Sequence, residues 1–194
     1  MAIRPYQGIQ TVASSTVAQP LFGTTLTAAS TFSVDRFTGN NKPGSTTPPV
    51  TLTVASSVGM KVDDHVLVGL LASFTNAAKM ANPQILDQGV IASIVDGTHI
   101  TVQGLLKNHA SGEYVVLNET ASYIQLIPVT IAGQFLVGTD SSTSLTDPSV
   151  YAAGTATYWN PLVQPTATGC TYQTCEAWLL GTAADTFVAS FYQV

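Results

Sequence analysis

Apolar and polar positions alternate along much of the chain with the period of two that is typical of β-strands. The clearest case is residues 50–54, where Val50, Leu52 and Val54 alternate with threonines. Successive side chains of a strand point to opposite faces, so this pattern predicts a half-buried strand. Val and Thr, which favour strands, are abundant throughout. We therefore expect an all-β protein.

Residues 49–119 contain several such segments and predict a small β-barrel of the SH3-like or OB-like kind. Apolar runs at 90–95 and 99–102 flank Asp96-Gly97, with Thr98 opening the second run. Asp-Gly between apolar runs predicts a hairpin with a type I′ turn, which needs positive φ at both central residues.

One segment has helical character. Residues 73–80 contain an Ala-Ala pair, but Asn82-Pro83 stops a helix soon afterwards. We interpret the segment as a loop with about one helical turn.

Residues 1–48 predict an extended N-terminal arm and a linker. Pro5, Gly8 and the serines at 14–15 interrupt the apolar residues of the arm, which therefore has no core of its own. Residues 39–49 consist almost entirely of turn formers and prolines, which indicates a linker.

Residues 120–194 predict a C-terminal β-sandwich or jelly-roll-like domain, because turn residues separate short apolar segments about ten residues apart. The expected strands are 123–127, 135–137, 156–159, 176–180 and 187–192. Residues 18–25 also resemble residues 133–140, since both contain Gln, three mostly apolar residues and Gly-Thr. If this echo is real, part of the arm pairs with the C-terminal domain and the barrel is inserted between them.

The composition indicates a protein that packs against partners. Hydrophobic residues make up 45% of the chain and charged residues 9%, against roughly 25% charged in an ordinary soluble protein. The exterior must then consist largely of small polar and apolar groups, which suits contact with copies of itself or with another protein.

Charge and hydropathy also argue against two classes of partner. The net charge is −5 and the six Lys and Arg residues are scattered singly, whereas nucleic-acid binding needs clustered positive charge. The apolar runs are far shorter than the roughly 20 residues of a membrane-spanning helix. The first residues lack the apolar stretch of a signal peptide, so we expect folding in a cytoplasm.

The ionisable clusters predict no catalytic, cofactor or metal site, and we expect no enzyme. Residues 63–65 (Asp-Asp-His) are interpreted as a solvated corner that caps a turn, with Asp63 and His65 on one face and Asp64 on the other. His109 and Ser111 lack the G-x-S-x-G pattern and an identifiable acid and base, so residues 108–112 are interpreted as a loop in which Gly112 adopts positive φ. His99 is expected to face solvent or a neighbouring strand.

Cys170 and Cys175 leave two alternatives open. A single C-x4-C pair lacks the second ligand pair of a zinc site. The two residues are either thiols in a β-hairpin or a disulfide that forms outside a reducing cell.

Aromatic residues gather in the last 40 residues and are candidates for a surface that binds a partner or a glycan. About half of them, notably Phe187 and Phe191, are instead expected in the core. Together with apolar residues of the arm, the candidate interface is Ile3, Tyr6, Ile9, Tyr158, Trp159, Trp178 and Tyr192.

Four segments resemble virion proteins of tailed bacteriophages that act as capsid decoration (cement) proteins and combine a small β-barrel with a second β-domain. They are residues 52–56, 59–64, 105–115 and 135–140, about a third of the chain. The resemblance implies a non-enzymatic role on the capsid surface, as many copies bound to the major capsid protein and to one another. A trimer would match three-fold positions of the shell.

Three other functions remain as alternatives. A receptor- or glycan-binding tail or fibre component would use Tyr158, Trp159 and Trp178. A polysaccharide hydrolase would need two suitably spaced carboxylates, and the acids here are sparse and mostly in turns. A major shell protein would be unusually short at 194 residues without a long helix.

Overall fold

The protein is a two-unit, mostly β structure. A computed structural model describes residues 8–13, 17–31, 49–121, 123–130, 134–138, 141–142, 151–152, 172–181 and 186–192. Strands form most of these residues, which confirms the all-β prediction. One compact unit comprises residues 1–22 and 118–194, and the other comprises residues 23–117. The second unit is therefore inserted in the first, and it begins earlier than the expected boundary at residue 49.

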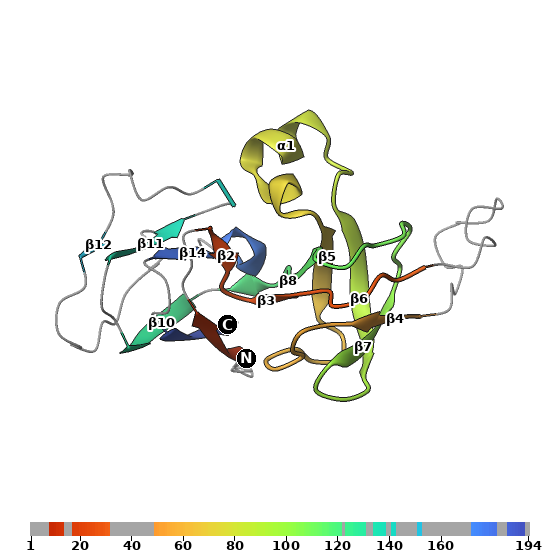
Figure 1. Cartoon of the computed structure of the whole chain (residues 1–194), viewed down its shortest axis with the longest axis horizontal. Helices are drawn as coiled ribbons and strands as arrows, with labels where there is room; N and C mark the ends of the chain where they lie inside the picture. The colour runs from red at the N-terminus through yellow and green to blue at the C-terminus, as the bar shows by residue number, and fades with distance from the viewer. Residues whose placement is uncertain are drawn as a thin grey trace, which may run out of the picture. The chain divides into compact units, whose positions relative to one another are not determined.

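The inserted unit is one antiparallel sheet of six strands in the order β3-β8-β5-β6-β7-β4 (Figure 1). Its elements are β3 (Gly23–Thr25), β4 (Val50–Thr53), β5 (His65–Gly69), the 3-10 helix η2 (Leu71–Phe74), α1 (Asn76–Ala81), β6 (Asp87–Ile94), β7 (His99–Gln103) and β8 (Tyr114–Leu117).

The two outer strands of this sheet meet, so that the sheet curls into a barrel. Leu26, just after β3, forms an antiparallel bridge with Val54, just after β4. The Thr27 amide donates to the Thr53 carbonyl and the Ala55 amide donates to the Thr25 carbonyl, each at 2.9 Å. We call this meeting of the ends of β3 and β4 the seam. It satisfies backbone groups that an open sheet edge would leave unpaired.

The barrel interior holds the residues that the alternating pattern predicted. Leu52 and Val54 are buried, and Ile100 and Val102 repeat the alternation on β7. Together with Phe74 these side chains are at most 1% exposed. Burial of such side chains contributes about 1.5–3 kcal/mol each, which makes this interior the main source of the barrel's stability.

The connection between β5 and β6 contains more helix than the sequence indicated. Figure 1 shows η2 and α1 following β5, before the chain returns as β6. Thr75 starts α1 because its hydroxyl accepts the Ala78 amide at 3.1 Å, as an N-cap residue does. The expectation of about one helical turn was too low because this cap and the buried Phe74 stabilise two short helical pieces.

The hairpin at Asp96-Gly97 is present, but its turn is not type I′. β6 and β7 pair from Ile94 opposite Ile100, and the connecting loop includes Thr98, which was expected to open β7. Neither Asp96 nor Gly97 has positive φ. The Asp96 carboxylate instead accepts the Thr98 amide at 2.7 Å, so a side-chain-capped turn replaces the backbone turn that we predicted.

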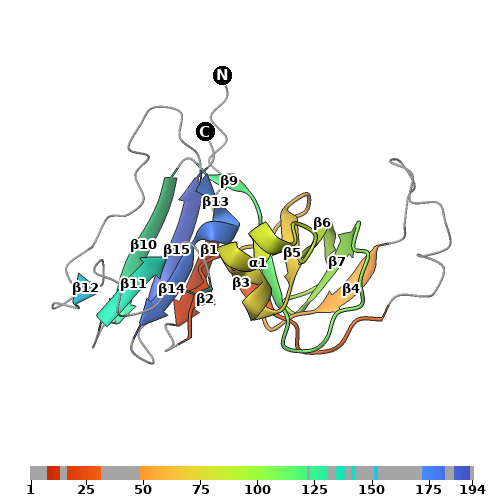
Figure 2. The same cartoon turned by 90° about the horizontal axis from the view of Figure 1, so that it is seen from above.

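The other unit contains two main sheets, in the orders β1-β15-β10 and β12-β11-β14-β2, together with the short pair β9-β13 (Figure 2). Its elements are β1 (Gly8–Ala13), β2 (Gln19–Pro20), β9 (Thr120–Ala121), β10 (Tyr123–Thr130), β11 (Gln134–Gly138), β12 (Tyr151–Ala152), β13 (Tyr172–Gln173), the 3-10 helix η3 (Thr174–Glu176), β14 (Trp178–Gly181) and β15 (Thr186–Tyr192).

Aromatic side chains form part of the buried core of this unit. Phe187 and Phe191 of β15 are fully buried, as their shared parity predicted. The ring of Phe22, which follows β2, meets that of Phe191 edge to face, with centroids 4.9 Å apart. This contact joins the turn after β2 to β15.

The N-terminal segment belongs to this unit rather than forming a separate arm. β1 pairs with β15 over six residues, and β2 pairs with β14. Residues 8–13 and 19–20 of the expected arm therefore pair with strands of the C-terminal region, the alternative that the sequence left open for part of the arm. The pairing of residues 18–25 with the C-terminal third, which the echo required, is present through β2.

The linker at 39–48 and the expected strand at 156–159 lie outside the described residues. The 3-10 helix η3 replaces the start of the strand expected at 176–180.

The Ile100→Ala variant tests the barrel interior. Ile100 is fully buried opposite Leu52, so truncation should lower the free energy of unfolding by about 2–5 kcal/mol. Val95→Ala in the same hairpin is the control, because Val95 is 59% exposed and its change should stay within about 0.5 kcal/mol. Denaturant unfolding followed by circular dichroism measures both, and equal effects would contradict this description of the core.

Two glycine substitutions test the packing of β6 and the geometry of the turn between β6 and β7. A Cβ on Gly89 would overlap Val102 Cγ1 and lie 2.8 Å from the Gln103 carbonyl oxygen, so Gly89→Ala should cost about 1–3 kcal/mol. A Cβ on Gly97 would meet nothing within 4 Å, so Gly97→Ala should change stability by less than about 0.5 kcal/mol. A large loss for Gly97→Ala would instead favour the type I′ turn.

Candidate functional site

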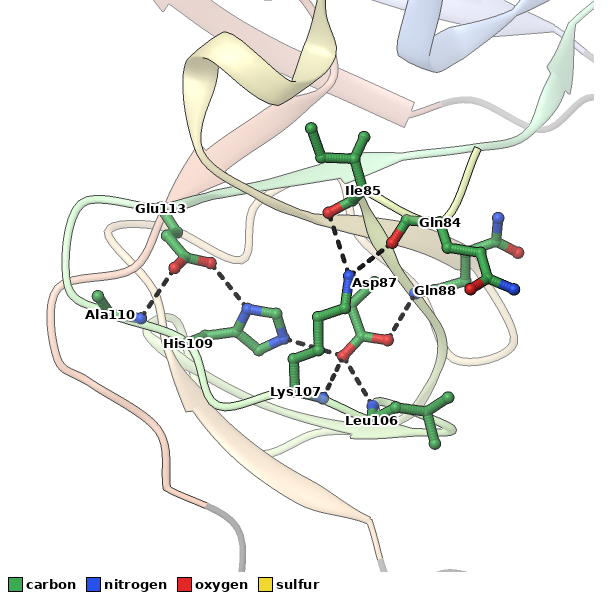
Figure 3. A network of polar contacts seen from close by, with 9 residues as sticks. All are labelled: Gln84, Ile85, Asp87, Gln88, Leu106, Lys107, His109, Ala110 and Glu113. Carbon is green, nitrogen blue, oxygen red and sulfur yellow. Dashed lines mark hydrogen bonds and ion pairs between the residues drawn. The ribbon is translucent and has the colours of Figure 1, made fainter. Parts of the chain in front are cut away.

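A buried cluster of charged side chains occurs in the inserted unit, where the loop between β7 and β8 lies against the start of β6. It consists of Asp87, His109 and Glu113 (Figure 3). The side chains of Asp87 and His109 are 4% and 2% exposed, and that of Glu113 is 13% exposed. We call these three residues the His109 cluster.

The imidazole of His109 lies between the two carboxylates. Its Nε2 atom is 3.2 Å from Asp87 Oδ2 and its Nδ1 atom is 2.7 Å from Glu113 Oε2. An ionised carboxylate only accepts hydrogen bonds, so each of these contacts needs an N–H on the ring. Both ring nitrogens carry a hydrogen only in the imidazolium form. The geometry therefore fits a protonated His109.

Backbone amides complete the coordination of both carboxylates. Asp87 Oδ2 accepts the amides of Leu106 and Lys107, each at 2.7 Å, and Asp87 Oδ1 accepts the Gln88 amide at 3.1 Å. Glu113 Oε1 accepts the Ala110 amide at 3.2 Å. Figure 3 shows the amides of Leu106 and Lys107 reaching Asp87 from the loop, and the Ala110 amide at Glu113. They supply hydrogen bonds to the carboxylates in place of the water lost on burial.

Opposing effects act on the pKa values of Asp87 and His109. Burial is the largest influence on Asp87 and raises its pKa, but the hydrogen bonds from His109, Lys107 and Leu106 outweigh it, so that the pKa is lowered. Burial lowers the pKa of His109, and the hydrogen bonds and charges of Asp87 and Glu113 outweigh it, so that the pKa is raised above its ordinary value of 6.5. Both shifts favour the charged forms.

Two glycines with φ in the left-handed region lie on either side of His109 in this loop. Gly104 has φ +92° and Gly112 has φ +88°, conformations that other residues rarely adopt. The positive φ of Gly112 confirms the prediction made from the sequence. Between these glycines, the loop turns back so that His109 exchanges backbone hydrogen bonds with Ser30, at 2.9 and 3.1 Å. We call residues 104–113 the latch loop.

The arrangement fastens the latch loop and offers little scope for catalysis at His109. Both ring nitrogens already contact carboxylates, and the residue is 3% exposed. The Ser111 hydroxyl donates to the Thr27 carbonyl at 3.1 Å. Within the described ranges, no group of His, Cys, Asp and Glu side chains is placed to hold a metal ion. Whether the whole chain is an enzyme stays a prediction.

Residues 108–112 form a loop, as predicted, but the expectation that no acid lies near His109 was wrong. Asp87 precedes it by 22 residues, and only the fold brings the two together. Glu113 was a signal that could have been used, because it lies four residues from His109 across a turn that contains Gly112.

The corner at residues 63–65 is partly as predicted. Asp64 caps its turn by accepting the Lys61 amide at 2.7 Å, but it is buried rather than solvated, at 3% exposed. Asp63 adopts φ 71° and is exposed, as is His65. This pattern, with Asp63 and His65 exposed and Asp64 buried, agrees with the predicted placement of Asp63 and His65 on one face and Asp64 on the other.

His99 offers a surface counterpart to His109. Its Nδ1 lies 2.9 Å from Asp96, but the side chains are 39% and 53% exposed. The Thr98 amide and His99 lower the pKa of Asp96 to about 2. The prediction that His99 faces solvent or a strand neighbour is consistent with this exposure. Solvent weakens such a pair, so it is a suitable control for the His109 cluster.

The described part of the chain contains three of the candidate interface residues, Ile9, Trp178 and Tyr192. Trp178 is fully buried, and its indole N–H donates to the Cys175 carbonyl at 2.9 Å, so it is a core residue and not an exposed anchor. Ile9 lies opposite Ser190 in the sheet, and Tyr192 lies opposite Tyr123. The residues outside the described ranges are Ile3, Tyr6, Tyr158 and Trp159.

Cys175 lies in η3 and not in the β-hairpin that we expected. Its thiol donates to Asn118 Oδ1 at 3.0 Å, and the residue is buried. Cys170 lies outside the described residues, so the alternative of a disulfide is untested.

Comparison with protein-family models, curated proteins and solved structures finds no match to this chain. In the part of the chain that the structure describes, no helix has the length and apolar character needed to cross a membrane. The resemblance to phage decoration proteins therefore rests on the segments of sequence already described.

The Asp87→Asn variant tests the cluster. Replacing this buried carboxylate leaves His109 without its partner on one side and puts a neutral amide against two backbone donors, so the free energy of unfolding should fall by about 3–5 kcal/mol near neutral pH. Asp96→Asn is the matched control at the exposed pair and should have little effect. Thermal and denaturant unfolding compare the two variants. Similar small losses would show that the cluster does not hold the loop.

Proposed function

We propose that the chain is a non-enzymatic structural protein of a bacteriophage particle, which binds the outside of the capsid and stabilises it by bridging capsomers. Its proposed partners are the major capsid protein and further copies of itself, and its proposed location is the capsid surface. The observation that carries the proposal is the scarcity of charge on the exterior of an all-β chain.

The structure makes this scarcity more pronounced than the composition does. The chain has eleven acidic residues, and Asp64 and Asp87 are almost completely buried. Glu113 is largely enclosed by its contacts with His109 and Ala110. Fewer acids are then left to cover the exterior. A freely dissolved protein relies on surface charge to avoid association, so such an exterior favours a protein held in an assembly.

Binding to an expanded shell would stabilise it because any protein that binds the assembled state preferentially shifts the equilibrium toward that state. Many copies with several contacts each would make moderate individual affinities sufficient. β1 already pairs with β15, so the proposal does not require residues 8–13 to add a strand to a neighbouring subunit.

The alternative of a glycan-binding tail or fibre component has less support. It drew on Tyr158, Trp159 and Trp178, and Trp178 is a fully buried core residue. Sugar-binding aromatic rings must be accessible to stack on their ligand.

The proposal is tested by mixing the purified chain with expanded phage shells that lack it. We expect saturable binding with copy numbers comparable to those of the major shell protein, and a higher temperature of shell disassembly than for shells alone. The same chain should give no specific signal on a glycan array. Binding of only a few copies per particle, or glycan binding without shell binding, would contradict the proposal and favour the tail or fibre alternative.

A further inference from the structure

Two other segments of the barrel unit contact the latch loop. Asp87 links it to the start of β6, and the backbone of His109 pairs with Ser30. The ammonium group of Lys107 donates to the carbonyls of Gln84 and Ile85, at 2.6 and 3.2 Å. The latch loop is therefore the common partner of two segments that are distant in sequence, residues 84–87 and Ser30.

These contacts continue directly into the seam. The Leu26 amide donates to the Glu113 carbonyl at 2.7 Å, and the Gly112 amide donates to the Leu26 carbonyl at 2.8 Å. Leu26 is also the residue that bridges Val54. The position of the latch loop is thus coupled to the place where the barrel closes.

We propose that the His109 cluster is a proton-dependent latch: protonated His109 holds the latch loop against β6 and the 26–31 segment, and loss of this proton releases the loop and loosens the seam. This inference is independent of the proposed virion role, because it concerns the inserted unit alone.

The proton on His109 matters because it sets how many N–H groups the imidazole ring can donate. A neutral imidazole carries one N–H, so it can donate to either Asp87 or Glu113 but not to both. The other carboxylate then faces a nitrogen lone pair at 2.7–3.2 Å, in a site that is shielded from water. Two negative charges would also remain there without the imidazolium between them. Such an uncompensated buried charge strongly destabilises a fold.

The charged groups around His109 are few. β6 contributes Asp87, and the latch loop contributes Glu113 and Lys107. The 26–31 segment has no ionisable side chain, and the 84–85 turn contributes carbonyl oxygens to Lys107. Lys107 is exposed and its ammonium group is occupied by those carbonyls, so it does not replace the positive charge of His109.

The direction of the pH dependence follows from the raised pKa of His109. A group whose pKa is higher in the folded state stabilises that state fully below its unfolded pKa of about 6.5, and this stabilisation is lost as the pH rises through the folded pKa. Asp87 acts oppositely: its lowered pKa stabilises the fold above about 3.8, and this contribution is lost as the pH falls through the folded value. The latch should thus be closed at mildly acidic pH and open at alkaline pH.

Limited trypsin digestion of the full chain tests the latch, because Lys107 lies in the latch loop. Cleavage after Lys107 requires local opening, whereas cleavage after Lys61, in the turn before β5, serves as an internal reference for the activity of trypsin. The ratio of the two cleavage rates, read by mass spectrometry, should rise about tenfold or more from about pH 6.5 to about pH 9. A ratio that stays constant over this range would overturn the proposal.

Two histidine variants test whether His109 causes the pH dependence of the cleavage ratio. His109→Gln should give a high ratio at every pH, because glutamine cannot carry the charge or donate to both carboxylates in the same way. His99→Gln, at the exposed pair with Asp96, should keep the pH dependence of the unsubstituted protein. Persistence of that dependence in His109→Gln, or its loss in His99→Gln, would contradict the assignment.

A measurement on the unsubstituted protein covers the case in which His109→Gln does not fold. The backbone amides of Leu106 and Lys107 donate to Asp87 in the closed latch. Their hydrogen exchange, corrected for the intrinsic effect of pH, should lose protection over the same pH range while the core amide of Val102 keeps it. Unchanged protection of the two loop amides would overturn the proposal independently.

Discussion

Carboxylates buried between a loop and the start of a strand must obtain from the protein the hydrogen bonds that water would otherwise supply. Around His109 this requirement determines the course of a whole loop: the amides of residues 106 and 107 face Asp87, and the amide of Ala110 faces Glu113. The loop then passes beside Ser30 and Leu26, and Leu26 bridges Val54 where the sheet closes. The solvation of two acids is in this way connected to the closure of the barrel.

Much of the fold could be predicted because it depends on local patterns. The alternation at residues 50–54 placed Leu52 and Val54 in the interior, and the shared parity of Phe187 and Phe191 placed both in the core. The Asp96-Gly97 hairpin was recognised because its signal is contained within a few residues. The turn type of this hairpin was predicted incorrectly, because the Asp96 side chain competes with the backbone for the Thr98 amide.

The site could not be predicted because it depends on contacts between distant segments. Asp87 and His109 are far apart in sequence, and neither lies in a recognisable motif. Trp178 was taken for an interface residue because composition cannot distinguish an aromatic anchor from a core aromatic; its burial in β14 decides this. The low charge content, in contrast, could be read directly. With Asp64 and Asp87 buried, it remains the property that best supports a role within an assembly.

The insertion of the barrel also affects the order in which the chain can fold during synthesis. The strands of the inserted unit all lie between residues 23 and 117, so this unit can fold once that stretch has left the ribosome. β1 is made first, but its partner β15 begins at residue 186. For most of translation β1 therefore has no β15 to pair with, and a strand with open hydrogen-bonding groups must be kept from pairing elsewhere. Rapid folding of the barrel would help by bringing residues 22 and 118 together early, which shortens the effective loop that closes the surrounding unit.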